Sequence, residues 1–151
     1  MIYADTNFFT NTLVDMSHRS EAEGLLIESP LRLPVTWLHR LEVVNALRQC
    51  VFLTRQGMQQ LRVTAELASA AEARFFDEVD LGIHYQHSSI HPETVETMFR
   101  DLSHRHTAKE GFRTYDILHV ASALVLGCDT FWSFDAKAKK LAKLEGLAVN
   151  A

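Results

Sequence analysis

The sequence lacks the features that define several large protein classes. It has only two cysteines, Cys50 and Cys128, and their spacing fits neither a disulfide framework nor a zinc site. No run reaches the roughly 18 apolar residues of a membrane span. The first residues, MIYADTNFF, have no basic segment followed by a long apolar stretch, unlike a signal peptide. We therefore expect two buried thiols, no membrane partner and a soluble cytoplasmic protein.

The sequence also lacks a surplus of positive charge. Its formal net charge is −4, which disfavours a general nucleic-acid coat but leaves room for a local basic groove. Of its 151 residues, 47% are hydrophobic, which is enough to build a core. No internal repeat or linker interrupts the chain. We therefore expect a single domain spanning residues 1–151.

Short apolar runs alternate with longer segments of helical periodicity. The expected strands are residues 1–5, 31–35, 80–85, 128–134 and 147–151. The expected helices are residues 6–15, 20–29, 36–53, 58–79, 91–108, 114–127 and 136–146. This alternation predicts an α/β fold, with a parallel sheet covered by helices on both faces. In such folds ligands bind at the carboxyl ends of the strands.

Four acidic residues stand in positions that favour a shared site. Asp5 follows MIYA and Asp135 follows TFWSF, so both are expected at the ligand-binding edge of the sheet. Asp116 lies in the first turn of a helix, and Glu42 interrupts the apolar pattern of WLHRLEVVNAL. Neighbouring carboxylates repel and raise one another's pKa values, and a divalent cation removes this conflict. Oxygen ligands favour Mg²⁺ or Mn²⁺, which can activate water for attack at phosphorus.

Each of these residues also has an ordinary structural interpretation. Asp5 and Asp135 can cap the helices that follow them. Asp116 can act through the helix dipole, and Glu42 can be a solvent-exposed helix residue. His119, on an apolar helix face, is interpreted as structural. His104 and His106 have an open role, either in phosphate binding or in a solvated loop.

Other phosphate-transfer enzymes fit the sequence less well. A haloacid-dehalogenase-like phosphatase needs a second aspartate two positions after the first, where this chain has Asn7. A receiver domain would have paired acids before the acid of the first strand, and these are missing. The sequence G-x-x-x-x-G-K-[ST] does not occur, which excludes a P-loop enzyme.

Four segments together resemble the acid-bearing motifs of PIN domains, in the order of that family. They are YADTN, LEVVNAL, TYDILHVASAL and FWSFDAKAKKLA. The resemblance runs from Ile2 to about Val149 and is greatest to the VapC-type toxins of bacterial toxin–antitoxin pairs. It implies a three-layer α/β/α sandwich with a central parallel sheet of four to five strands. It also implies a Mg²⁺- or Mn²⁺-dependent endoribonuclease that cleaves single-stranded RNA.

The resemblance also implies roles for individual residues. The acids that bind metal and carry catalysis would be Asp5, Glu42, Asp116 and Asp135. The polar residues that support the site or contact RNA would be Thr6, Asn7, Asn45 and Arg113. A cognate antitoxin and a homodimer are the implied protein partners. Two alternatives stay open: a PIN-like RNA-binding or scaffold module without catalysis, and another Mg²⁺-dependent phosphohydrolase.

Overall fold

The computed structural model describes residues 1–58 and 61–151, which form two compact units. The terminal unit combines Met1–Asp5 with Ser89–Ala151, so it contains both ends of the chain. The inserted unit is Thr6–Ser88. The boundary between the units falls between Asp5 and Thr6, which are both candidate site residues from the sequence.

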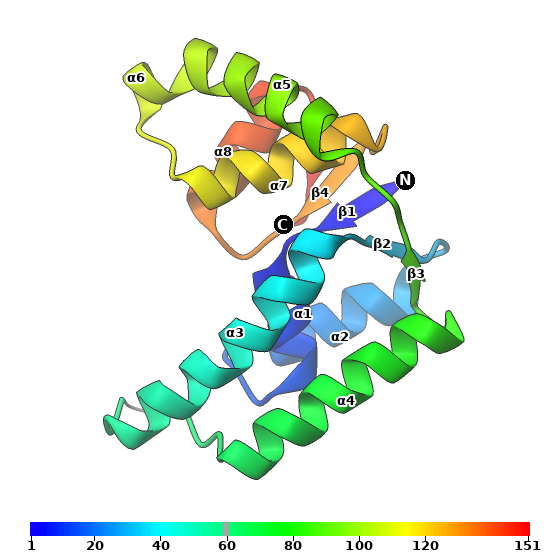
Figure 1. Cartoon of the computed structure of the whole chain (residues 1–151), viewed down its shortest axis with the longest axis vertical. Helices are drawn as coiled ribbons and strands as arrows, with labels where there is room; N and C mark the ends of the chain where they lie inside the picture. The colour runs from blue at the N-terminus through cyan, green and yellow to red at the C-terminus, as the bar shows by residue number, and fades with distance from the viewer. Residues whose placement is uncertain (59–60) are drawn as a thin grey trace. The chain divides into compact units, whose positions relative to one another are not determined.

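The terminal unit is built on a parallel three-stranded sheet (Figure 1). Its strands are β1 (Ile2–Ala4), β4 (Thr130–Trp132) and β5 (Ala148–Val149), in the order β1-β4-β5. The backbone N–H of Asp5 donates to the carbonyl of Trp132 at 3.1 Å, which extends the pairing one residue beyond β1. Because β1 and β4 are parallel, the residues that follow β1 and those that follow β4 lie at the same edge of the sheet, at the carboxyl ends of the strands.

The helices of the terminal unit pack their apolar residues with the sheet. They are α5 (Pro92–Leu102), the π-helix η1 (Ser103–Thr107), α6 (Ala108–Glu110), α7 (Thr114–Val125) and α8 (Ala136–Leu144). Tyr3 and Phe131 stack with ring centroids 5.7 Å apart, in one buried cluster with Val120 of α7 and Leu141 of α8. Each large apolar side chain buried in this way contributes about 1.5–3 kcal/mol to folding. This packing places the first turns of α7 and α8 in the same unit as the end of β1.

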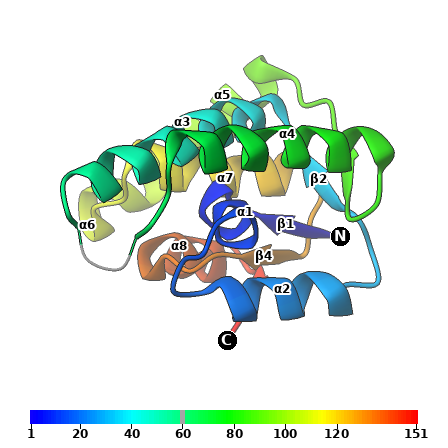
Figure 2. The same ribbon diagram turned by 90° about the horizontal axis from the view of Figure 1, so that it is seen from below.

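The inserted unit has four helices and a parallel pair of strands among its described residues (Figure 2). Its elements are α1 (Thr6–Leu13), α2 (Arg19–Glu28), β2 (Leu33–Val35), α3 (Trp37–Arg55), α4 (Ala65–Leu81) and β3 (Tyr85–His87). The core of this unit centres on Phe9, whose ring contacts those of Phe75, Tyr85 and His39 at centroid distances of 5.0–5.7 Å. Aromatic packing of this kind holds α1 against α3 and α4.

The predicted α/β class with parallel strands is confirmed, but the strands are divided differently. All strand pairs among the described residues are parallel, and the strands number five. Three of them pair in the terminal unit and two in the inserted unit, whereas we predicted one central sheet of four to five strands. Short strands of two or three residues carry too little pattern to reveal their partners.

Several element boundaries also differ from the prediction. The helix expected at 58–79 begins at Ala65, because Thr64 caps it by accepting a hydrogen bond from the N–H of Leu67 at 3.1 Å. Residues 59–60 of that prediction lie outside the described part of the chain. The strand expected at 80–85 lies at Tyr85–His87, because α4 continues to Leu81 and ends at Gly82. Gly82 has φ 67°, a left-handed conformation that glycine adopts without strain.

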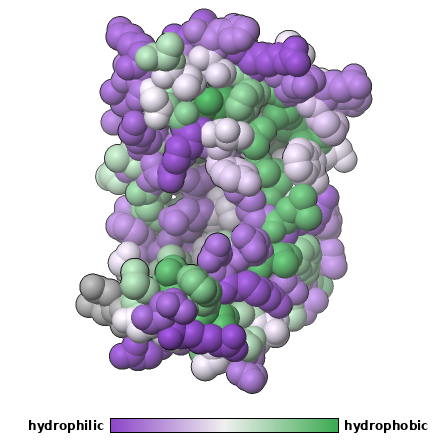
Figure 3. All heavy atoms as spheres, turned by 60° about the vertical axis from the view of Figure 1, so that its left-hand side comes forward, coloured by the Kyte–Doolittle hydropathy of each residue, from purple (hydrophilic) through white to green (hydrophobic). Residues whose placement is uncertain are grey.

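The surface drawn in Figure 3 combines hydrophilic residues with smaller areas of hydrophobic ones. Leu41 of α3 is 64% exposed although it belongs to the apolar pattern WLHRLEVVNAL, and its neighbour Glu42 is half-buried. In the ranges 1–58 and 61–151, no helix has both the length and the apolar character needed to span a bilayer.

Candidate active site

Asp5 directly follows β1 and has a buried carboxylate. Its side chain is 6% exposed, and its Oδ2 accepts a hydrogen bond of 2.6 Å from the hydroxyl of Ser133. The last two residues of β1, Tyr3 and Ala4, are fully buried, and Asp5, which follows them, stays buried as well. A buried carboxylate needs such donors, because its desolvation is otherwise costly.

Ser133 is a residue that the sequence analysis missed. Its Oγ donates to Asp5 and accepts from the backbone N–H of Asp135 at 2.9 Å. Its own N–H donates to Oδ1 of Asn150 at 2.9 Å. One hydroxyl therefore links the first acid to the backbone of the last. The available signal was a small polar residue between Trp132 and Phe134 in the run TFWSF, and the structure shows that this residue is fully buried.

Asp116 lies in the first turn of α7 and is 6% exposed. Its Oδ2 accepts from the backbone N–H of Arg113 at 3.2 Å, as in a capping box. The Arg113 side chain adds two longer contacts, from Nε to Oδ2 at 3.3 Å and from Nη2 to Oδ1 at 3.4 Å. The helix start thus orients the carboxylate through the backbone, and the guanidinium balances its charge.

Asp135 caps α8 and also contacts Arg113. Its Oδ1 accepts from the backbone N–H groups of Lys137 and Ala138 at 2.8 and 3.1 Å. Its Oδ2 accepts from Nη2 of Arg113 at 2.6 Å. Arg113 is therefore shared by Asp116 and Asp135. The hydrogen bond to Asp116, with the charges of both carboxylates, raises the pKa of Arg113 above its usual value.

The remaining predicted residues belong to the inserted unit. Thr6, the first residue of α1, donates from Oγ1 to Oε1 of Glu42 at 2.8 Å. Glu42 is therefore held by the hydroxyl residue that directly follows Asp5 in the chain. Asn7 is exposed, and its Oδ1 accepts from Asn11 at 3.1 Å. Asn45 is exposed on α3.

The predicted site residues therefore fall into two sets with internal contacts. The terminal unit brings together Asp5, Asp116, Asp135 and Arg113, with Ser133 added by the structure. The inserted unit brings Thr6 to Glu42. One of the structural interpretations is also correct, since Asp135 caps α8. Asp116 lies in the first turn of α7, the position on which its helix-dipole interpretation depends.

The donors of the terminal unit match a hard divalent cation in chemical type. Carboxylate and hydroxyl oxygens are the ligands that Mg²⁺ and Mn²⁺ prefer, and zinc favours nitrogen and sulfur. Within the described ranges, however, no three Asp, Glu, His or Cys side chains are already grouped to hold a metal ion. Arg113 supplies the positive charge between two of the carboxylates.

Two of the histidines, His119 and His106, have protein partners that suit structural roles. His119 is buried, and its Nδ1 lies 2.8 Å from the hydroxyl of Tyr3. Nε2 of His106 lies 2.6 Å from Glu145, a carboxylate that also accepts two hydrogen bonds of 2.7 Å from Arg105. These contacts tie α7 to β1 and η1 to the end of α8.

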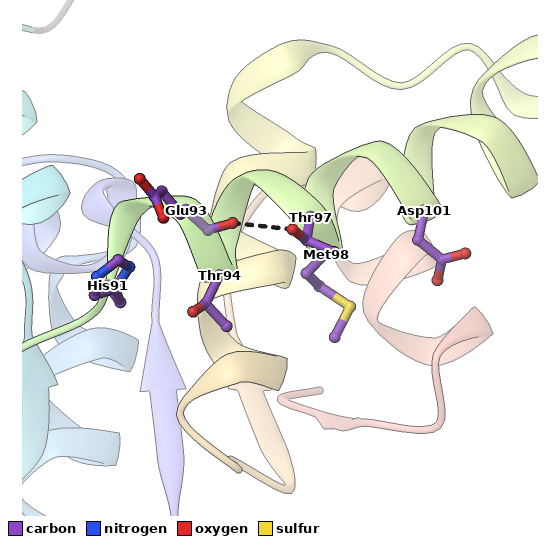
Figure 4. A pocket seen from close by; sticks show the side chains of 6 residues that line it. All are labelled: His91, Glu93, Thr94, Thr97, Met98 and Asp101. Carbon is purple, nitrogen blue, oxygen red and sulfur yellow. Dashed lines mark hydrogen bonds between the residues drawn. The ribbon is translucent and has the colours of Figure 1, made fainter.

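The terminal unit has a surface pocket whose lining residues include none of the predicted site residues. It is lined along α5 by His91, Glu93, Thr94, Thr97, Met98 and Asp101 (Figure 4). Thr94, Met98 and Asp101 project to the same side of the helix, and the Thr97 hydroxyl donates to the Glu93 carbonyl at 3.1 Å. This hollow contains none of the acids named from the sequence.

The chain matches the family model for the PIN domain over residues 2–144 and belongs to that family. No curated protein matched the sequence. Solved structures show the same fold at low identity. A Mycobacterium tuberculosis toxin described as cleaving the sarcin–ricin loop, VapC20, has 16% identity and a TM-score of 0.66, over 93% of this chain and 94% of its own.

Two further solved structures show the same likeness. VapBC2 from Rickettsia felis, bound to a promoter DNA fragment, has 13% identity and a TM-score of 0.63, over 99% of this chain and 98% of its own. FitAcB from Neisseria gonorrhoeae has 14% identity and a TM-score of 0.61, over 100% of this chain and 97% of its own. The predicted PIN-like α/β fold is therefore confirmed.

Proposed function

We propose that this protein is a metal-dependent endoribonuclease, the toxin of a VapBC-type toxin–antitoxin pair. The observation that carries the proposal is the set of buried or half-buried acids Asp5, Asp116 and Asp135, joined through Ser133 and Arg113 in a PIN-family chain. We propose that residues 1–151 act as one domain, because the family match runs unbroken through both units.

Asp5, Glu42, Asp116 and Asp135 would hold Mg²⁺ or Mn²⁺ through their carboxylates. When bound, such a cation lowers the pKa of a coordinated water and neutralises charge at a scissile phosphate.

The polar residues around these acids keep them in position. Ser133 orients the Asp5 carboxylate, and Thr6 orients that of Glu42. Backbone N–H groups orient Asp116 and Asp135, so neither acid depends on a flexible side chain for its placement. Asn7, Asn45 and Arg113, which are all exposed, would contact the RNA.

The proposed partners follow from the neighbours. Two of the similar solved structures are toxin–antitoxin complexes, which supports a cognate antitoxin for this chain. We propose a homodimer in the cytoplasm as its working form. A short open reading frame beside the gene, whose product co-purifies with this chain and suppresses its cleavage of RNA, would establish the toxin role.

The decisive experiment compares RNA cleavage by the wild type and by Asp116→Asn. Asparagine can still accept the hydrogen bond from the Arg113 backbone, so the helix start is retained while the charge is lost. We expect Mn²⁺-dependent cleavage of single-stranded RNA that EDTA abolishes and that Asp116→Asn reduces by about a hundredfold or more. Glu96→Gln is the matched control, because it removes an exposed carboxylate that pairs only at the surface with Arg100.

Equal cleavage by Asp116→Asn and the wild type would contradict the proposal. RNA binding without any metal-dependent cleavage would favour the non-catalytic PIN-like module instead.

A further inference from the structure

One nitrogen of Arg113 contacts two of the proposed metal ligands. Its Nη2 lies 2.6 Å from Oδ2 of Asp135 and 3.4 Å from Oδ1 of Asp116. These two carboxylate oxygens can be no further apart than the sum of those distances. The guanidinium therefore neutralises a pair of like charges that would otherwise repel.

A divalent cation held by Asp116 and Asp135 would compete for these oxygens, because the other oxygen of each carboxylate already accepts from backbone N–H groups. Mg²⁺ binds its oxygen ligands at about 2.0–2.1 Å, closer than a guanidinium nitrogen approaches either carboxylate. A cation and Nη2 cannot both lie between the two oxygens. A cation bound between these two oxygens would therefore exclude this ion pair.

The two carboxylates are built to keep their positions when the guanidinium leaves. On Asp135, Oδ1 accepts from the backbone and Oδ2 contacts Arg113. On Asp116, Oδ2 accepts from the backbone N–H of Arg113 and from its Nε, and Oδ1 accepts from its Nη2. The Arg113 side chain is 70% exposed, against 7% for Asp116 and 33% for Asp135, so it can swing into solvent.

We infer that Arg113 is a built-in counterion of Asp116 and Asp135, that a divalent cation displaces it, and that the released guanidinium then pairs with an RNA phosphate. This inference rests on the proposed function and adds a coupling between metal loading and substrate binding. A planar guanidinium suits both partners, because carboxylate and phosphate accept its paired N–H donors alike. Arg113 thus pairs with the carboxylates of Asp116 and Asp135 before the cation binds, and with an RNA phosphate afterwards.

The test measures Mn²⁺ affinity without RNA, by the loss of the free-ion electron paramagnetic resonance signal. We compare the wild type, Arg113→Gln and Arg100→Gln. Arg100 is a matched control because it is 72% exposed in the same unit and pairs with Glu96 at 3.6 Å. Removing the competitor should tighten Mn²⁺ binding by about three- to tenfold in Arg113→Gln, the effect of one to two exposed ion pairs. Arg100→Gln should stay near the wild type.

A second measurement separates this role from a purely structural one. At saturating Mn²⁺, Arg113→Gln should raise the KM for single-stranded RNA several-fold, because one phosphate contact is lost. Metal affinity and RNA affinity thus change in opposite directions. Melting curves with and without Mn²⁺ check folding, and the Mn²⁺-induced rise in melting temperature should be larger in Arg113→Gln.

Weaker or unchanged Mn²⁺ binding by Arg113→Gln would overturn the inference, as would an unchanged KM. If the wild type binds Mn²⁺ and cleaves RNA in an Asp116-dependent way while Arg113→Gln binds Mn²⁺ no more tightly, this inference alone fails. If the wild type neither binds Mn²⁺ nor cleaves RNA, the proposed function fails and this inference with it.

Discussion

The hydroxyl of Ser133 donates a 2.6 Å hydrogen bond to Oδ2 of Asp5, although 128 positions of sequence separate the two residues. The hydroxyl oxygen of Ser133 also accepts a hydrogen bond from the backbone N–H of Asp135 at 2.9 Å. Ser133 is fully buried, so bulk solvent does not reach its hydroxyl and cannot substitute for these two hydrogen bonds. It joins the strand end that carries the first acid to the helix start that carries the last.

The first prediction concerns Ser133→Ala. Removing the hydroxyl leaves the buried carboxylate of Asp5 without one donor and the N–H of Asp135 without its acceptor. We expect a loss of about 1–3 kcal/mol in the free energy of unfolding, measured in urea, and a reduced rate of RNA cleavage.

Ser122→Ala is the control for this change. Ser122 is 2% exposed in the same unit, and its hydroxyl donates at 2.7 Å to the carbonyl of Leu118 within α7. It should lose some stability but retain cleavage. Equal cleavage by the two variants would show that Ser133 has no part in positioning Asp5.

The second prediction concerns the pair Thr6 and Glu42. A double-mutant cycle with Thr6→Val, Glu42→Gln and the double variant isolates their 2.8 Å hydrogen bond. Because one partner is a half-buried carboxylate, we expect a coupling energy of about 1 kcal/mol in urea unfolding. Strictly additive single changes would mean that Thr6 does not hold Glu42 in solution.

The third prediction concerns pH and Glu145. Hydrogen bonds from Arg105, then from His106, with the charges of both, lower the pKa of Glu145 below its ordinary value of 4.5. A carboxyl with a lower pKa in the folded state stabilises the protein above its unfolded-state pKa. That contribution is lost as the pH falls through the folded-state pKa.

Thermal melts of the wild type and Glu145→Gln between about pH 7 and pH 3 test this linkage. The wild type should melt higher at neutral pH, and the gap should close at the acid end. Glu96→Gln, which changes an exposed partner of Arg100, should show a small gap throughout. A gap for Glu145→Gln that is independent of pH would contradict the assignment.

Many of the helices and strands could be predicted from the sequence, because they depend on the local pattern of apolar and capping residues. The helix expected at 36–53 is observed at Trp37–Arg55, and Pro92 begins α5 as expected for a first-turn proline. The predicted start of the helix at 58–79 was wrong. The observed helix begins at Ala65, because the Thr64 side chain caps it, although the residues before Thr64 also have a helical composition. The functional assignment of the four acids stays a prediction, although the structure places three of them in one unit.

The sequence by itself determined which residues can carry charge at strand ends and helix starts, because strand and helix periodicity follow from neighbouring side chains. Only the tertiary structure decided which of those charges meet. Arg113 is three residues from Asp116 but 22 from Asp135, and Ser133 is 128 from Asp5. Hydrogen bonds across such separations depend on how the strands pair and the helices pack, and no local pattern of residues encodes them.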